Sequence, residues 1–214
     1  MTIALPAKTH WEQVYSSKPS EAVSWYQIHA ELSLKMIKAT SVPRSARVID
    51  VGGGASTLVD DLLALQFSNI CVMDLSAAAL NRVQQRLGPD AKRVRWLEAD
   101  VTQAQLDEHS VDVCHDRAVF HFLTSAEDRA AYVQQVPRTV KPGGHVIVAT
   151  FAEDGPLQCS GLPVMRYSAN ALHAEFGKGF RLLQHERESH TTPLGTAQQF
   201  VYCYCRTPLS HPKH

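Results

Sequence analysis

The stretch that most constrains the fold of this chain runs from Arg47 to Ser56 and reads Arg-Val-Ile-Asp-Val-Gly-Gly-Gly-Ala-Ser. Its apolar run at 48–51 predicts a buried strand, and the spacing of apolar residues over 56–65 predicts a helix. Three glycines join these elements, and residues without a Cβ let the backbone turn sharply and a ligand approach closely. Strand, glycine turn and helix form the first unit of a nucleotide-binding α/β fold.

The glycine spacing and the acid before it restrict the ligand. The phosphate-binding fingerprint is G-x-G-x-x-G; Gly52 and Gly54 match it, but position 57 is threonine. Asp50 stands two residues before the first glycine. A carboxylate there would repel a pyrophosphate but could accept hydrogen bonds from a cation or an amine.

The pattern Asp50-x-Gly52-x-Gly54 resembles motif I of the class I S-adenosylmethionine-dependent methyltransferases. In that family the loop wraps the methionine end of the sulfonium cofactor. The resemblance therefore implies S-adenosyl-L-methionine as cofactor and S-adenosyl-L-homocysteine as product. Ser56 replaces the last glycine of the fullest motif, D-x-G-x-G-x-G, and serine suits a helix N-cap. The cofactor-binding residues implied at this turn are Asp50, Gly52, Gly53, Gly54 and Ser56.

Acids follow the next two predicted strands, 69–74 and 94–98. Asp74 lies 20 residues past Gly54, close to the spacing of the ribose-binding acid in nucleotide folds, with Leu75 beside it. The alternative is a plain turn residue. Asp100 matches the family's acid that accepts the adenine amine, and Val101 would form an apolar wall; the alternative is a solvated acidic loop.

The remaining elements extend the resemblance over nearly the whole chain. A Lys-Pro-Gly-Gly turn at 141–144 before a buried strand is frequent in the family. Ser76 and Ser168 are predicted N-caps. The resemblance implies an α/β fold with a seven-stranded, mostly parallel Rossmann-like sheet, helices on both faces and an antiparallel last strand. The further strands predicted from the sequence are 110–117, 145–151, 180–190 and 199–206, and the further helices are 11–20, 30–39, 77–87, 125–139 and 169–176.

Three regions are expected along the chain: an N-terminal helical lid at 1–43, the S-adenosylmethionine-binding domain at 44–206, and a flexible tail at 207–214. In the lid, Trp25 and Tyr26 have aromatic faces suited to shielding a sulfonium cation, or they only pack the lid onto the body. The loop at 153–164 is unusually long, which suggests a substrate wall.

The candidate catalytic residues are Asp116, His115 and His121, at and just after the end of the fourth predicted strand, where α/β sheets bind ligands. Asp116 is also a candidate for cofactor contact. Each could be a general base or a satisfied structural group. A base is needed only if the nucleophile must lose a proton, and a thiolate needs none.

Composition limits the partners and the compartment. The 21 Lys and Arg residues balance 21 Asp and Glu residues, which argues against a broad nucleic-acid footprint. The five cysteines form no disulfide pattern, which indicates a reducing, cytoplasmic compartment. The scattered histidines predict no metal site, and no apolar run is long enough to predict a membrane span.

The sequence leaves the acceptor open. A nucleophile (O, N or S) of a small molecule is the first choice. A protein-lysine N-methyltransferase is an alternative, because Asp116-Arg117-Ala118 partly echoes an Asp-Lys-Gly of such enzymes. A non-catalytic S-adenosylmethionine-binding module and a nicotinamide dehydrogenase are also compatible with the pattern, and the oligomeric state is open.

Overall fold

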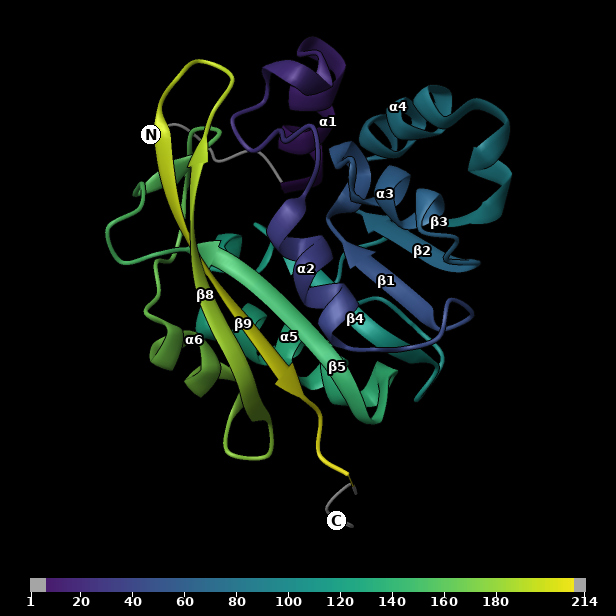
Figure 1. Ribbon diagram of the computed structural model, residues 1–214. Helices are drawn as coiled ribbons and strands as arrows, with labels where there is room; N and C mark the ends of the chain where they lie inside the picture. Colours follow the sequence, from purple (N-terminus) through teal and green to yellow (C-terminus); the bar gives the residue numbers. More distant parts are fainter. Residues whose placement is uncertain (1–6, 210–214) are drawn as a thin grey trace.

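The computed structural model describes residues 7–209, which are built around one seven-stranded sheet (Figure 1). The strand order is β3-β2-β1-β4-β5-β9-β8. The first five strands are parallel, β9 runs antiparallel to β5, and β8 runs antiparallel to β9. This confirms the predicted fold class. The strands are β1 Arg47–Val51, β2 Asn69–Asp74, β3 Val94–Glu98, β4 Val111–Arg117, β5 Val140–Phe151, β8 Arg181–Thr191 and β9 Ala197–Arg206.

Helices cover both faces of the sheet because strands buried on both sides send alternate side chains to opposite cores. Val48 packs into the core formed with α2, α3 and α4, whereas Ile49 and Val51 pack into the core formed with α5 and α6. A further helix, α1, packs on α4 (Figure 1). The helices are α1 Ala7–Ser17, α2 Glu31–Ala39, α3 Leu58–Ala64, α4 Ala77–Leu87, α5 Ala126–Thr139 and α6 Ala169–Phe176.

Serine side chains begin several of these helices. Ser76 and Ser168 each accept a hydrogen bond from the backbone N–H three residues on, as the sequence predicts, and Ser125 does the same. Ser56 is displaced by one residue from its predicted role. Thr57 is the N-cap of α3, and Ser56 Oγ accepts from the N–H of Leu58 at 3.0 Å.

Two segments that the sequence predicts to be a turn and a loop contain β-strand residues in the structure. The prediction of a separate Lys-Pro-Gly-Gly turn is wrong, because β5 already begins at Val140. The register between β4 and β5 shifts opposite this segment. Gly143 has a φ of +69°, so the segment is an irregular start of the strand. The loop at 153–164 contains a small hairpin, in which β6 Gln158–Cys159 pairs with β7 Leu162–Pro163.

The residues predicted to form a lid and a tail make specific contacts with the body. Residues 31–39 belong to the main core, since Met36 and Ile37 of α2 are fully buried there. Residues 7–28 lie at the end of the sheet where the parallel strands finish (Figure 1). At the other terminus, Thr207 is buried and donates to the carbonyl of Lys141 at 2.7 Å. Residues 1–6 of the lid and 210–214 of the tail lie outside the described residues. Within 7–209, no helix has the length and apolar character to span a bilayer.

Candidate cofactor-binding and active site

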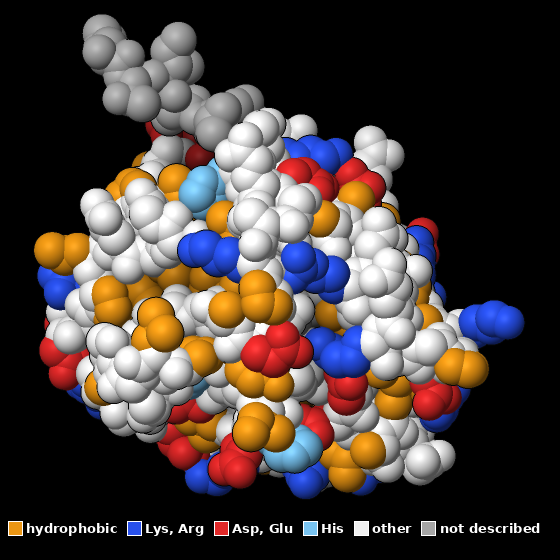
Figure 2. Space-filling model, turned by 90° about the horizontal axis from the view of Figure 1, so that it is seen from above, with side chains coloured by type: hydrophobic (Ala, Val, Ile, Leu, Met, Phe, Trp, Pro, Cys, Tyr) orange, Lys and Arg blue, Asp and Glu red, His pale blue; other side chains and the backbone are white. Residues whose placement is uncertain are grey.

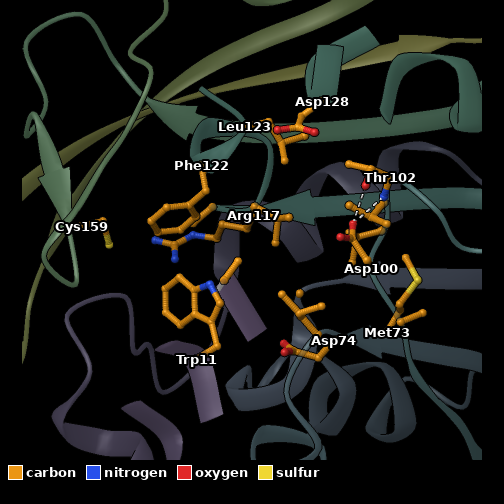
Figure 3. Close-up of a pocket in the computed structure, with 18 of the residues that line it drawn as sticks. Trp11, Met73, Asp74, Asp100, Thr102, Arg117, Phe122, Leu123, Asp128 and Cys159 are labelled. Carbon is orange, nitrogen blue, oxygen red and sulfur yellow. Dashed lines mark hydrogen bonds between the residues drawn. The ribbon is translucent and has the colours of Figure 1, made fainter. Parts of the chain in front are cut away.

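A cavity of about 250 Å³ opens at the carboxyl ends of the parallel strands (Figure 3). Its walls come from the tips of β1, β2, β3 and β4, from the N-terminal segment and from the β6–β7 hairpin. The residues that line it are Ala7, Trp11, Tyr15, Trp25, Val51, Gly52, Met73, Asp74, Leu75, Ala99, Asp100, Val101, Thr102, Arg117, Ala118, Val119, Phe122, Leu123, Asp128 and Cys159.

The glycine turn has no room for side chains. Gly52 has a φ of +70° and lines the cavity, and a Cβ built on it would lie 2.0 Å from Val119 Cγ2. A Cβ on Gly53 would lie 2.2 Å from Asp50 Oδ2, and one on Gly54 would lie 2.7 Å from the carboxylate of Asp74. Gly53 and Gly54 therefore allow these acids to pack under the turn, and only Gly52 of the three lines the cavity.

Asp74 lies at the tip of β2 and faces the cavity (Figure 3). Its Oδ2 accepts from the N–H of Gly54 at 3.0 Å and its Oδ1 from the N–H of Ser76 at 2.8 Å. Burial raises the pKa of Asp74 to about 6, against the lowering effect of these two bonds. Each carboxylate oxygen keeps a lone pair for a ligand hydroxyl.

Asp100 and its neighbours form the wall beside Asp74. Asp100 Oδ1 accepts from the N–H of Thr102 at 2.9 Å and from its hydroxyl at 2.7 Å. Val101 and Leu75 line the cavity as well. The tips of β2 and β3 bring the two acids together because the strands are parallel neighbours.

Aromatic side chains from the N-terminal segment cover the other end of the cavity. Trp25 and Trp11 line it with ring centroids 5.7 Å apart, and Trp11 is 5.0 Å from the ring of Phe122. Tyr15 is 6.1 Å from Trp25. Tyr26 packs in the same cluster but does not line the cavity.

Asp50 and His115 are buried beneath the glycine turn rather than exposed in the cavity. His115 Nδ1 is 2.7 Å from Asp50 Oδ1, and its Nε2 is 2.9 Å from the hydroxyl of Ser33 in α2. Both ring nitrogens of His115 therefore have partners within the protein. Asp50 Oδ2 is buried without one.

Asp116 and His121 are fully buried and do not line the cavity. Asp116 accepts from the N–H groups of Val119 and Phe120 and from the hydroxyl of Tyr132. His121 Nδ1 accepts from the N–H of Phe151 at 3.2 Å, and its Nε2 has no partner. Burial lowers the pKa of His121 to about 3, which keeps the imidazole neutral.

Replacing Asp116 by asparagine should change how stability depends on pH. Burial raises the pKa of Asp116 to about 6, so the folded chain binds this proton more tightly than the unfolded chain, whose carboxyl titrates near ~3.9. The stabilising contribution is present below pH ~4 and is lost as pH rises through about 6. The free energy of unfolding of the wild type exceeds that of Asp116→Asn by an amount that depends on pH. This difference should fall by up to about 3 kcal/mol as the pH rises from ~4 through about 6. Urea unfolding at several pH values measures it, and a constant difference would contradict the assignment.

Sequence reasoning did not identify Arg117 and Cys159 as site residues. Arg117 ends β4 and lines the cavity, and it could have been found as the last residue of a strand whose carboxyl end faces the ligand. Cys159 lies in the segment that the sequence suggested as a substrate wall. Met73, Thr102, Phe122, Leu123 and Asp128 carried no sequence signal. The described residues contain no group of three His, Cys, Asp or Glu side chains that could hold a metal ion.

Residues 49–148 match the model of a family described as a methyltransferase domain. The chain is 26% identical over 138 residues to the eEF1A lysine and N-terminal methyltransferase of Bos taurus, covering 64% of this chain and 19% of that protein. It is 32% identical over 104 residues to an uncharacterized methyltransferase of Mycobacterium tuberculosis, covering 49% of this chain and 50% of that one. The chain thus spans about a fifth of the first relative and half of the second.

Solved structures share the fold at low sequence identity. One, described for the conversion of a disulfide bond into a thioacetal group during echinomycin biosynthesis, has a TM-score of 0.78 at 16% identity, with 96% of this chain and 94% of that chain covered. The 1,6-didemethyltoxoflavin-N1-methyltransferase of Burkholderia thailandensis, with S-adenosylhomocysteine bound, has a TM-score of 0.65 at 16% identity, with 97% and 93% covered.

A seven-stranded sheet with a glycine turn and two strand-tip acids defines the class I methyltransferase architecture. Residues 49–148 match the methyltransferase-domain family, and this part of the chain is a methyltransferase domain of that architecture. The residues present are compatible with the cofactor, since Asp74 offers free lone pairs at the cavity and Gly52 forms a wall without a side chain.

Proposed function

We propose that the chain transfers the methyl group of S-adenosylmethionine to a nucleophile of a small-molecule acceptor. The observation that carries this proposal is the division of the cavity. Asp74 and Asp100 lie at the tips of β2 and β3, and Trp11, Phe122 and Arg117 lie on the side of the cavity toward Cys159 (Figure 3). When bound, the cofactor supplies an activated methyl group with its own leaving group, so the protein's tasks are orientation and exclusion of water.

The proposed roles follow from position. Asp74 accepts from the ribose hydroxyls, Asp100 accepts from the adenine amine, and Leu75 and Val101 pack against the base. Gly52 lies along the methionine end, and Trp25 shields the sulfonium. Asp50, Gly53, Gly54, Ser56 and Tyr26 support this surface from beneath or beside it.

The three candidate bases receive structural roles in this proposal. Asp116 fixes the turn after β4 through two backbone N–H groups, and His115 fixes Asp50 against α2. His121 is neutral and accepts from the N–H of Phe151, the last residue of β5. None of the three lines the cavity, so none is proposed to remove a proton from the acceptor.

A protein lysine is the second candidate because the relatives include eEF1A lysine methyltransferases. The aromatic side chains that cover the cavity favour a small molecule. On the face seen in Figure 2, Lys and Arg side chains are interspersed with Asp and Glu, which gives no support to a nucleic-acid partner. The five cysteines are free and buried, which supports a reducing, cytoplasmic location.

Filling the end of the cavity lined by Cys159 should separate acceptor binding from cofactor binding. Cys159 is 4% exposed and lines the cavity, so Cys159→Phe should obstruct a small acceptor and reduce its methylation about tenfold or more. Affinity for S-adenosylhomocysteine should stay within about twofold, because the acids are at the other end. Transfer of labelled methyl to small thiols, amines and phenols, and calorimetry, give the two readouts.

Leu157→Phe is the matched control, because Leu157 precedes the same hairpin and is 67% exposed. It should leave both readouts unchanged. Efficient methylation of a lysine peptide from eEF1A by the wild-type protein, with no transfer to the small molecules, would contradict the small-molecule proposal.

A further inference from the structure

The end of the cavity that the aromatic side chains cover contains polar side chains that can donate hydrogen bonds. We call this end the acceptor half and define it by six lining residues. These are Trp11, Tyr15, Trp25, Arg117, Phe122 and Cys159. The chemistry assigned to the acceptor half rests on the proposed function, in which Asp74 and Asp100 hold the cofactor.

Arg117 is a fixed cation in this wall. Its side chain is 9% exposed and donates from Nε to the hydroxyl of Tyr202 at 2.9 Å, from Nη1 to the carbonyl of Trp25 at 3.2 Å, and from Nη2 to Glu188 at 3.0 Å. Its guanidinium also lies 4.2 Å from the ring centroid of Phe200. Three of the five N–H donors of an arginine are used by these bonds, and Glu188 does not line the cavity. The guanidinium therefore stays in place and keeps donors for a ligand.

The other two titratable side chains of the acceptor half hold their protons at neutral pH. Burial raises the pKa of Tyr15 well above its usual value and the pKa of Cys159 to about 11. An arginine does not lose its proton in proteins. All three side chains can thus donate a hydrogen bond, and none can take a proton from an acceptor.

The carboxylates that line the cavity are assigned or bonded to other groups. Asp74, which is near enough to Tyr15 to help raise its pKa, and Asp100 are assigned to the cofactor, and Asp128 accepts from the hydroxyl of Ser125 at the start of α5. Figure 3 shows Asp128 beside Leu123 and well separated from Cys159. Among the described residues, no histidine lines the cavity. The acceptor half therefore has a cation and proton donors but no general base.

We infer that the acceptor half takes a small apolar molecule whose nucleophile enters as an anion, and that this nucleophile is a thiolate beside Arg117. An ammonium would be repelled by the guanidinium and would need a base before it could attack. A phenol, with a pKa of ~10, is mostly protonated at neutral pH, whereas a thiol near ~8.5 supplies its thiolate to the site directly. Burying an anion requires a nearby cation and donors, which Arg117 and Tyr15 provide.

The transfer balances in atoms and charge. The thiol gives its proton to solvent before it binds. The thiolate sulfur then forms a bond to the methyl carbon while the bond from that carbon to the sulfonium sulfur breaks, and the bonding pair stays on the cofactor. The products are a neutral methyl thioether and neutral S-adenosylhomocysteine.

The first test compares acceptors of one shape on the wild-type protein. Benzyl mercaptan, benzylamine and benzyl alcohol differ only in the nucleophile. We expect kcat/KM for the thiol to exceed that for the amine and the alcohol by about tenfold or more. Faster methylation of the amine or the alcohol, or no transfer to the thiol by a protein that binds S-adenosylhomocysteine, overturns the inference and leaves the proposed function standing. Absence of S-adenosylhomocysteine binding overturns both.

The second test changes the charge beside the thiolate in both directions. Glu188→Gln removes the carboxylate behind Arg117 and should lower KM for the thiol several-fold. The double variant Arg117→Met/Glu188→Gln removes the cation without leaving an unpaired buried acid, and should raise KM about tenfold or more. Inhibition by the neutral product, benzyl methyl sulfide, should stay nearly constant in both, because it carries no charge. Equal KM values for the thiol in the two variants, with folding confirmed by retained S-adenosylhomocysteine binding, contradict the role of Arg117.

Discussion

Replacing Gly52 by alanine should destabilise the protein by several kcal/mol and abolish measurable cofactor binding. The left-handed backbone at Gly52 costs a residue with a Cβ about 1–2 kcal/mol. The new Cβ would lie 2.0 Å from Val119 Cγ2, and relieving such overpacking costs about 1–3 kcal/mol more. Moving Val119 also displaces a residue that lines the cavity. Urea unfolding measures the loss of stability, and calorimetry with S-adenosylhomocysteine measures the loss of binding.

Gly195→Ala separates the backbone effect from the clash. Gly195 has a φ of +82° with no heavy atom within 4 Å of a built Cβ, and it lies in the β8–β9 turn. This control should lose only about 1–2 kcal/mol of stability and keep its cofactor affinity. Equal effects of the two substitutions on binding would show that the close approach at Gly52 does not matter.

Replacing Asp74 by alanine should weaken cofactor binding by about 1–3 kcal/mol, which is the range for lost hydrogen bonds to a charged group. The change removes the proposed partner of the ribose hydroxyls. It also frees the N–H groups of Gly54 and Ser76, which hold the glycine turn against the start of α4. Calorimetry with S-adenosylhomocysteine gives the difference directly.

Two further substitutions make the Asp74 result interpretable. Asp74→Asn keeps the shape and one carbonyl-type acceptor, so its affinity should fall between those of the wild type and the alanine variant. Asp90→Asn removes an exposed acid that pairs with Arg93 outside the cavity, and it should leave affinity unchanged. Unchanged affinity in Asp74→Ala would reject the ribose role.

The parts of the fold set by local pattern were predictable from the sequence. Strands β2 and β3 and helix α4 have the predicted bounds, because apolar runs and serine caps mark them within a few residues. Asp74 was predicted as a site residue from its spacing to the glycine turn and Asp100 from the resemblance to the methyltransferase motif, and both line the cavity. Parallel strands end at one edge of the sheet, so an acid after each strand must come near the other.

The catalytic candidates could not be sorted by the same reasoning. A parallel strand in the middle of a sheet is buried on both faces, so both side-chain directions of β4 lead to interior positions. His115 points to Ser33 of α2 and Asp116 points to Tyr132 of α5. Only the packed helices reveal that neither faces the cavity.

The acceptor half likewise depends on long-range contacts. Arg117 is held by Glu188 of β8 and Tyr202 of β9, which are 71 and 85 residues away in the chain. Cys159 reaches the cavity through a hairpin of two-residue strands, too short to show a pattern. Such pairings follow from the order of the strands in the sheet, and the local sequence pattern does not predict them.

The most direct test of the central claim is calorimetric titration of the full chain with S-adenosylhomocysteine and, separately, with NAD. The cavity should bind S-adenosylhomocysteine with micromolar affinity, and NAD should bind weakly or not at all, because the carboxylates at the glycine turn oppose a pyrophosphate. Micromolar binding of NAD, or no response to millimolar S-adenosylhomocysteine, would contradict the assignment of this cavity to the methyl donor.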